Sequence, residues 1–445
     1  MKKRELIFFA ALATFLSANA QEKQTWSLED CINYALEKNI QLQQNKISLQ
    51  ESEVDVKTAK AALFPSLSFN TGHNIVNRPY QENSATVSGT EIISSNNKTT
   101  YNDSLSAQWT LWNGGQRLNN IKQQKKNQEI AELTVAETEN TLKEEITKLF
   151  LQILYADESV NINKGTLEVS KATYERAKEL FNQGSISKAD LAQLEAQVGN
   201  DQYQLVTSES SLRNYKLQLK QMLELDGNME MELELPVLDD EKVMQLLPNQ
   251  DEVYQTALAN RPEIQSSKLS IDNSKLAISA AKSGYYPSIS LSASTSSMTN
   301  NASQNNWAQQ MKYGWNNMIG LTVSVPIFNN RQTKSAVEKA QFQYNSSLLN
   351  LQDKQKGLYT EIETLWLDAL NAQQQYAAAE VKLKSSQTSF DMVNEQFRLG
   401  MKNTVELLTE KNNLLSAQQQ RVQAKYMAIL NRTLLDFYAG KDIEL

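Results

Sequence analysis

Two hydrophobic patterns alternate along the chain. Long stretches rich in Leu, Glu, Lys, Gln and Ala predict helices, because these residues lose little side-chain freedom in a helix. Between them lie shorter stretches in which apolar and small polar residues alternate one by one, which predicts strands with two different faces. Pro65 and Pro287 mark the two places where a helix gives way to a strand. Proline removes a backbone donor and pushes the preceding residue toward extended geometry.

The whole order of elements occurs twice, which indicates an internal duplication rather than a short-period repeat. FPSLS at 64–68 lies 222 positions before YPSIS at 286–290. Further on the offset is 216, as between FNQGSISKADL at 181–191 and FRLGMKNTVEL at 397–407. The predicted helices are 28–63, 117–180 and 186–222 in the first half, and 262–283, 331–398 and 402–438 in the second.

The duplication predicts the organisation of the chain. The amino terminus has a basic start, an apolar stretch too short to span a bilayer and an Ala-Asn-Ala cleavage motif, which is typical of a signal peptide. An irregular segment between the repeats is expected to supply a short strand or a peripheral subdomain. The predicted boundaries are a signal peptide at 1–20, a first repeat at 21–223 with a β-hairpin at about 64–112, an equatorial linker at 224–250, a second repeat at 251–440 with a β-hairpin at about 285–328, and a tail at 441–445.

The strands carry an apolar face and an uncharged polar face. In WNNMIGLTVSVPI, residues 315–327, Ile319, Leu321, Val323 and Val325 alternate with small polar residues or glycine. A half-buried sheet of a soluble protein usually places Lys, Glu or Arg on its wet face. Serine, threonine and glutamine here suit a water-filled lumen with lipid on the other side, and a soluble sandwich is the alternative. The same alternation occurs in 66–71, 104–112 and 288–294.

Aromatic residues flank the strands in the positions expected of a membrane-interface girdle. In up-and-down order, five of them fall at one end of the predicted sheet, and Trp315 marks the opposite end. The predicted girdle is Phe64, Trp112, Tyr285, Tyr286 and Phe328.

Four strands cannot close a barrel, and an open sheet edge in lipid leaves backbone groups unsatisfied. The chain is therefore expected to oligomerise. Two copies would give eight strands, which side chains nearly fill, whereas three copies would give twelve and leave a channel. The predicted fold is mostly α with a membrane β-barrel portion, in which a duplicated unit of helix, β-hairpin, long helix and helix assembles as a trimer with a coiled-coil tunnel.

Composition excludes several kinds of chemistry. The net charge of −7 and the absence of a basic cluster argue against nucleic-acid binding. Cys31 is the only cysteine, so no intrachain disulfide forms, and His73 is the only histidine, so a zinc site or a histidine-based triad lacks material. His73 is interpreted as an ordinary residue at the strand rim. No phosphate-cradling glycine loop occurs. We expect no catalytic residue, no metal and no cofactor.

The chain resembles the TolC family of outer-membrane efflux proteins. The resemblance covers the mature sequence and rests on the duplicated layout, on ALEKN at 35–39, on FPSLS and YPSIS, on LWNGGQR at 111–117 and IFNNRQ at 327–332, and on the two tip motifs 181–191 and 397–407. It implies a homotrimeric channel-tunnel in the outer membrane of a Gram-negative bacterium. A twelve-stranded barrel would be continued by a helical tunnel across the periplasm. The implied partners are a periplasmic adaptor (membrane fusion) protein, an inner-membrane transporter of RND, ABC or MFS type and outer-membrane lipid.

The resemblance also implies roles for the two turns at the helix tips. Gly184 and Gly400 would lie where adaptor hairpins meet the tunnel, and Asp190, Glu406 and Lys402 would line the pore constriction. The alternative for these charged residues is a solvated helix face. The best-known pattern has a tyrosine and an arginine where this chain has Phe397 and Lys402. Phenylalanine donates no hydrogen bond, so the closed state is expected to be held differently or more weakly.

The function that the resemblance implies is a passive exit duct of a tripartite efflux or type I secretion system, with no enzyme activity. One alternative is a secreted coiled-coil adaptor or adhesin without a pore, which leaves the strands unexplained. A secreted hydrolase that uses a carboxylate pair ranks last, because no sugar-binding cleft is evident. The exported substrate does not follow from the sequence.

Overall fold

The computed structural model describes residues 25–77, 86–87, 90–91, 97–226, 231–234, 236, 240–301, 303 and 305–443. The predicted signal peptide lies outside the described residues. The chain divides into two compact units, each of which takes segments from both predicted repeats. Unit 1 comprises residues 1–46, 134–265 and 353–445, and unit 2 comprises residues 47–133 and 266–352.

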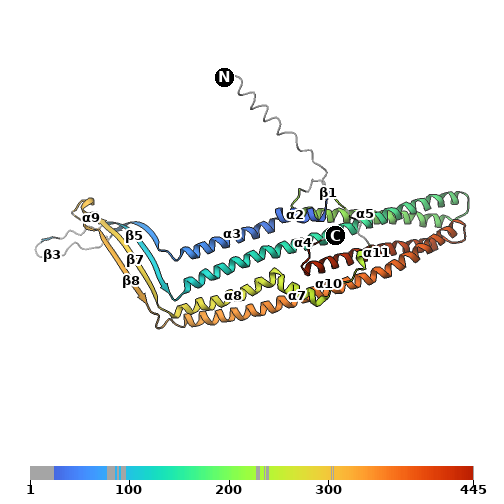
Figure 1. Ribbon diagram of the computed structural model, residues 1–445. Helices are drawn as coiled ribbons and strands as arrows, with labels where there is room; N and C mark the ends of the chain where they lie inside the picture. Colours follow the sequence, from blue (N-terminus) through green and yellow to red (C-terminus); the bar gives the residue numbers. More distant parts are fainter. Residues whose placement is uncertain are drawn as a thin grey trace, which may run out of the picture. The chain divides into compact units, whose positions relative to one another are not determined.

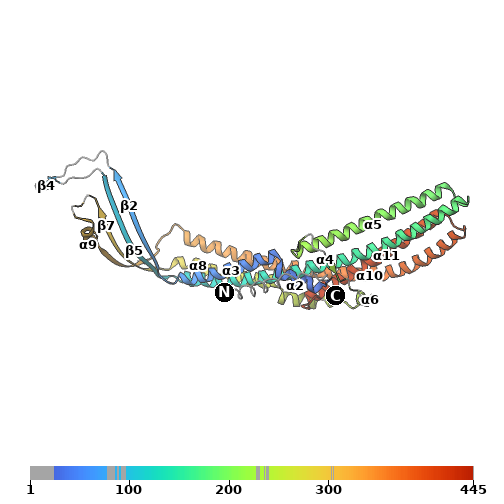
Figure 2. The ribbon, with the colours of Figure 1, turned by 90° about the horizontal axis from the view of Figure 1, so that it is seen from above.

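Helices make up most of the chain, and the predicted ones are present within a few residues of their expected ends (Figure 1). Those of the first repeat are α2 (Leu28–Lys38), α3 (Ile40–Ala61), α4 (Gln116–Asn182) and α5 (Lys188–Met222). Those that follow are α6 (Asp240–Val243), α7 (Gln250–Asn260), α8 (Pro262–Lys282), α10 (Gln332–Arg398) and α11 (Thr404–Tyr438). In unit 1, α5 lies beside α4 and α11 beside α10, in both Figure 1 and Figure 2.

The first predicted helix is two helices, because Asn39 ends α2 and begins α3. Its backbone leaves the helical region with ψ 127°. Its side-chain amide donates to the carbonyl oxygen of Met222, at 3.2 Å, and its side-chain oxygen accepts from the backbone N–H of Leu42, at 3.1 Å. An asparagine that caps a helix satisfies one of the orphan donors of the first turn. The prediction of one unbroken helix over 28–63 was wrong at this residue.

Unit 2 contains a four-stranded antiparallel sheet in the order β2-β5-β7-β8. The strands are β2 (Ser66–Asn77), β5 (Asn97–Asn113), β7 (Ser288–Asn300) and β8 (Asn316–Ser324). The central pair, β5 and β7, joins the hairpin of the first repeat to that of the second. Strands β2 and β8 form the two edges, and neither edge pairs with a further strand among the residues that the structure describes.

The register confirms the predicted two-faced alternation. Leu67 pairs with Ala107, Trp109 with Leu291, and Leu291 with Leu321, so the apolar residues share one face. The opposite face is a file of small polar groups, in which the hydroxyls of Ser68 and Ser106 are 2.9 Å apart. A register shift between Thr110 and Trp112 pairs Trp112 with Ile289. The extra residue therefore turns Trp112 onto the apolar face.

Short elements lie outside the main pattern. In unit 1, β1 (Thr25–Trp26) pairs in parallel with β6 (Glu232–Leu233), which comes from the segment between the repeats. In unit 2, β3 (Thr86–Val87) pairs with β4 (Thr90–Glu91), and a 3₁₀ turn spans Ser283–Tyr285. Helix α9 (Trp307–Tyr313), which lies between β7 and β8, was not predicted. Among the described residues, no helix has a stretch both long and apolar enough to cross a bilayer.

The core of the molecule lies in unit 1. A large apolar cluster packs residues of α2, α4, α5, α10 and α11 around the two-stranded β1-β6 sheet, with Phe150, Ile153 and Leu219 almost fully buried. Cys31 is a buried free thiol of the same cluster. Burial, and then the nearby Asp30 carboxylate, raise the pKa of this thiol to about 12, so it stays protonated and acts as a small apolar side chain.

Candidate functional site

The two glycines of the predicted tips end α4 and α10 in the same way. Gly184 has φ +75° and Gly400 φ +73°, in the left-handed region that costs other residues strain. The N–H of Ser185 donates to the carbonyl of Leu180, and that of Met401 donates to the carbonyl of Gln396, both at 2.9 Å. These bonds form Schellman motifs, which satisfy the last carbonyls of each helix. The glycines are therefore required by the turns themselves, whatever docks there.

An apolar cluster holds the two tips together within unit 1. It contains side chains from α4, α5, α10 and α11. Phe397 is 7% exposed and belongs to this cluster. The residue that cannot donate a hydrogen bond at this position therefore acts by apolar packing. The buried members are Ala177, Leu194, Phe390, Phe397, Leu407 and Leu414.

The predicted constriction acids both occupy the third position of a helix capping box. Ser187 caps α5 and donates its hydroxyl to the Asp190 carboxylate at 2.6 Å, while its oxygen accepts from the backbone N–H of Asp190. Asn403 caps α11: its side-chain oxygen accepts from the backbone N–H of Glu406 at 2.9 Å, and its own backbone N–H donates to the Glu406 carboxylate at 3.2 Å. Lys402 donates to Glu406 at 2.5 Å. The sequence placed these acids equivalently in the two repeats, and each stabilises the start of its own helix.

Both capping carboxyls are held in the charged form. The Ser187 hydroxyl, followed by that of Thr404, lowers the pKa of Asp190. The Lys402 ammonium and then the Asn403 backbone lower the pKa of Glu406. Asp190 lies on α5 and Thr404 lies on α11, so the effect of the Thr404 hydroxyl on Asp190 also links one tip to the other. Both acids are half-buried, and because their pKa values are lowered they carry negative charge at neutral pH.

A buried ion pair lies farther along the same helices, and the sequence analysis missed it. Lys411 of α11 is 7% exposed at its side chain and pairs with Asp201 of α5, which is 4% exposed. Ser170 of α4 donates to Asp201 at 2.5 Å and accepts from Lys411, and Gln197 donates to Asp201 at 2.9 Å. Burial lowers the pKa of Lys411, and the Asp201 carboxylate opposes that shift.

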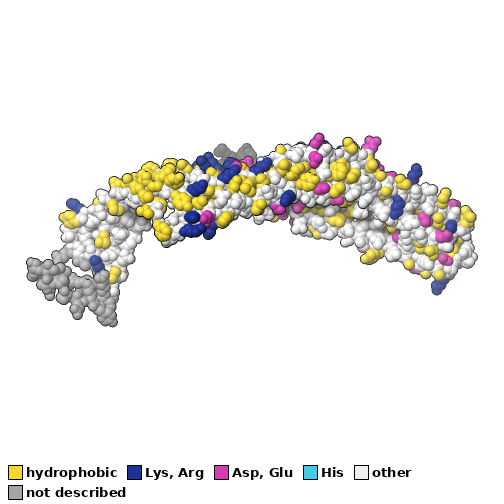
Figure 3. All heavy atoms as spheres, turned by 90° about the horizontal axis from the view of Figure 1, so that it is seen from below, with side chains coloured by type: hydrophobic (Ala, Val, Ile, Leu, Met, Phe, Trp, Pro, Cys, Tyr) yellow, Lys and Arg dark blue, Asp and Glu magenta, His cyan; other side chains and the backbone are white. Residues whose placement is uncertain are grey.

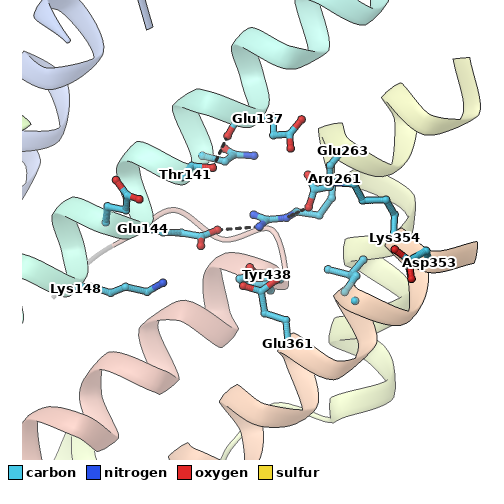
Figure 4. Close-up of a pocket in the computed structure, with 14 residues that line it drawn as sticks. Glu137, Thr141, Glu144, Lys148, Arg261, Glu263, Asp353, Lys354, Glu361 and Tyr438 are labelled. Carbon is cyan, nitrogen blue, oxygen red and sulfur yellow. Dashed lines mark hydrogen bonds and ion pairs between the residues drawn. The ribbon is translucent and has the colours of Figure 1, made fainter. Parts of the chain in front are cut away.

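A second charged cluster, around Arg261, lines a cavity of about 570 Å³ in unit 1 (Figure 4). The Arg261 guanidinium pairs with Glu144 at 2.8 Å and with Glu263 at 2.9 Å, and lies 4.0 Å from the centre of the Tyr438 ring. Burial raises the pKa of Glu144, against the pull of Arg261. Because its charge is already matched by two carboxylates, Arg261 fastens α4, α8 and α11 to one another.

The predicted girdle residues are all exposed at the ends of the sheet strands in unit 2. Their exposed fractions run from 46% for Trp112 to 83% for Phe328. The apolar sheet face is equally uncovered, with Leu67 at 71% and Ile319 at 81%. Figure 3 shows hydrophobic side chains gathered over this part of the molecule.

The histidine behaves as a structural residue. His73 lies inside β2, where its ring stacks on that of Tyr101 with 4.3 Å between the centroids. The prediction placed it at the rim of the strand, but β2 continues to Asn77. No group of three or more His, Cys, Asp or Glu side chains suited to a metal ion occurs among the described residues.

Comparison with protein families gives one match that covers most of the chain. The family described as "Outer membrane efflux protein" matches residues 31–224 and 253–441. Among curated proteins, the chain is 22% identical over 309 residues to the outer membrane protein TolC of Escherichia coli, which is 68% of this chain and 62% of that protein. It is 22% identical to TolC of Vibrio cholerae over 436 residues, 97% of this chain and 94% of the relative.

A third relative is the alkaline protease secretion protein AprF of Pseudomonas aeruginosa, 25% identical over 193 residues. That match covers 42% of this chain and 39% of AprF, so the chain spans less than two thirds of the length of AprF and of the E. coli TolC. Among solved structures, CusC superposes with a TM-score of 0.78 at 17% identity, over 93% of this chain and 92% of that one. VceC of Vibrio cholerae gives 0.76 at 15% identity, over 94% and 97%.

Proposed function

This chain belongs to the outer membrane efflux protein family, and from that premise we propose that three copies of it form a passive exit duct across the outer membrane and periplasm of a Gram-negative cell. In this proposal a periplasmic adaptor and an inner-membrane transporter supply the substrate. The duct serves a tripartite efflux or type I secretion system, and the chain itself does no chemistry.

The open sheet of unit 2 is the observation that carries the trimer. Its two edges, β2 and β8, lack partners within the sheet, and its apolar face is uncovered. In lipid, unpaired backbone groups cost several kcal/mol each, so the edges must pair with other copies. Three copies supply twelve strands, enough to close around a water-filled lumen lined by the serine face.

The helix tips support the constriction. A three-fold axis would repeat Asp190 and Glu406 as a ring of six carboxylates, with Lys402 paired to Glu406 in each copy. Like charges that face a narrow pore raise the local concentration of cations. We assign adaptor docking to the turns at Gly184 and Gly400, where nothing lies within 4 Å of an added Cβ and the surface is free.

Oligomeric state is the first test. Crosslinking of the detergent-solubilised protein should give a species of three subunit masses, because isolated sheet edges are unstable in lipid. A monodisperse monomer that keeps its full β-sheet signal would contradict the proposed assembly.

A planar-bilayer recording across a salt gradient tests the constriction. The variant Asp190→Asn with Glu406→Gln removes both charges but keeps an amide oxygen at each cap, and should move the reversal potential toward zero. The matched control, Glu168→Gln with Glu209→Gln, removes two exposed acids from α4 and α5 away from the tips. Equal reversal potentials for wild type and the tip variant would mean that the acids face the outside of the tunnel.

A further inference from the structure

The two units carry opposite charge. Unit 2 contains 15 Lys and Arg against 10 Asp and Glu, whereas unit 1 contains 29 against 41. The formal balance is therefore +5 in unit 2 and −12 in unit 1, although the chain as a whole is −7. The positive charge is therefore concentrated in unit 2, the unit that contains the membrane strands, although the whole chain is acidic.

The basic side chains of unit 2 gather where its four helices meet the strands. The eight helical residues nearest the sheet in each of α3, α4, α8 and α10 contain only two acids, Asp55 and Glu338. Figure 3 shows Lys and Arg side chains grouped beside the hydrophobic area. We call this set the basic collar; its members are Lys57, Lys60, Arg117, Lys122, Lys275, Lys282, Lys334 and Lys339.

Two lysines of the basic collar occupy equivalent positions in the two repeats. Lys60 stands four residues before Phe64 and five before Pro65, and Lys282 stands at the same distances before Tyr286 and Pro287. At the start of each hairpin, a lysine is therefore followed one helical turn later by an exposed girdle aromatic and then by a proline. Phe64 is 72% exposed and Tyr286 is 58% exposed.

Among the described residues, the ammonium groups of these two lysines have no partner. Both side chains are exposed, and within the described part of the chain neither makes an ion pair or a side-chain hydrogen bond. By contrast, Lys275 pairs with Asp272 at 3.0 Å. An unpaired ammonium offers three donors and a full positive charge to a ligand outside the chain.

We propose that Lys60 and Lys282 bind the phosphate groups of anionic phospholipids in the membrane leaflet next to the helices. An aromatic ring marks the depth of the membrane–water interface. A lysine one turn outside that ring reaches headgroup level, with its alkyl stem along apolar surface and its ammonium at the phosphate. Each lysine close to an anionic surface increases association by a factor of about five.

Selectivity for anionic lipid in the reconstituted protein tests this site. Spin-labelled phosphatidylglycerol and phosphatidylcholine with the same chains are compared by electron paramagnetic resonance, which gives their relative association with the protein. The wild type should favour phosphatidylglycerol, and less so at high salt. Lys60→Gln with Lys282→Gln should lower that preference about fivefold or more, whereas Lys60→Arg with Lys282→Arg should retain it.

The matched control is Lys171→Gln with Lys384→Gln, which removes two exposed lysines of unit 1 that have no ion pair among the described residues. Its lipid preference should equal that of the wild type. The proposal is overturned if the Lys60 and Lys282 variant keeps its preference or if the control loses it equally. Displacement of the labelled lipid by millimolar glycerol phosphate would instead assign the lysines to a soluble phosphate ligand. Neither result depends on whether the tips form the proposed constriction.

Discussion

Unit 1 and unit 2 solve the same problem, the burial of apolar surface, in opposite ways. Unit 1 packs helices around two apolar clusters and encloses charged pairs such as Lys411–Asp201 and Arg261–Glu144. Unit 2 leaves the apolar face of its sheet uncovered and has two open edges. The difference teaches that unit 1 carries its core within a single chain, whereas in the proposed trimer unit 2 relies on lipid and on other copies to cover its apolar face and edges.

In unit 1, the largest loss of stability is expected when the Lys411–Asp201 pair is broken. Lys411→Met leaves a buried carboxylate without its counter-ion, which should destabilise the surrounding helices by about 3–5 kcal/mol. Amide hydrogen exchange in α5 and α11 around residues 201 and 411 measures this as faster local opening. Adding Asp201→Leu to Lys411→Met should restore much of the protection. Unchanged exchange in the single variant would show that the pair is not closed to water.

In unit 2, the largest loss of stability is expected when a charge is placed on the uncovered apolar face of the sheet. Leu321→Arg, near the middle of β8, points toward lipid and should cost about 2–4 kcal/mol at the bilayer midplane. The control Thr322→Arg places the same charge on the serine face and should assemble almost normally. The yield of heat-modifiable oligomer in membranes measures both. Equal yields, or the reverse order, would mean that the apolar face does not meet lipid.

A smaller effect is expected at the tip glycines. Gly184→Ala and Gly400→Ala force a Cβ into the left-handed region and should each cost about 1–2 kcal/mol, through backbone strain alone because the space is open. Hydrogen exchange at the turns reports the loss. Gly184→Asn should be milder, since asparagine tolerates this conformation. An alanine variant as well protected as the wild type would show that the turn relaxes into another shape.

The smallest effect concerns acid. The lowered pKa values of Asp190 and Glu406 mean that stabilisation by the charged caps is present above their ordinary pKa values. It is lost as the pH falls through the lowered values. Cation selectivity, followed as the reversal potential between about pH 7 and pH 3, should therefore persist below about pH 4. Ser187→Ala should move the loss to higher pH, because the hydroxyl is the main cause of the shift at Asp190. If Ser187→Ala loses cation selectivity at the same pH as the wild type, the selectivity does not depend on the capped Asp190 carboxylate.

Local patterns determined most of the elements. Pro65 and Pro287 stop helices because of what proline does to its own backbone and to the residue before it. The period of two in 315–327 decided which residues share a sheet face, and the register agrees. Equivalent spacing in the two repeats identified both tip turns. The roles of the tip residues in the pore and in docking stay predictions, because a single chain contains neither a pore nor a partner.

Only the tertiary structure decided which distant residues meet. Lys411 lies between the buried Leu407 and Leu414 on the apolar face of α11. The sequence alone does not reveal that its partner is Asp201, which lies 210 positions earlier. The split at Asn39 depends on a carbonyl of Met222, and the turn of Trp112 onto the apolar face depends on its pairing with Ile289. Periodicity and propensity act over a few residues. The partners of a buried charge, a helix cap or a bulge lie wherever the folded chain returns, so packing alone selects them.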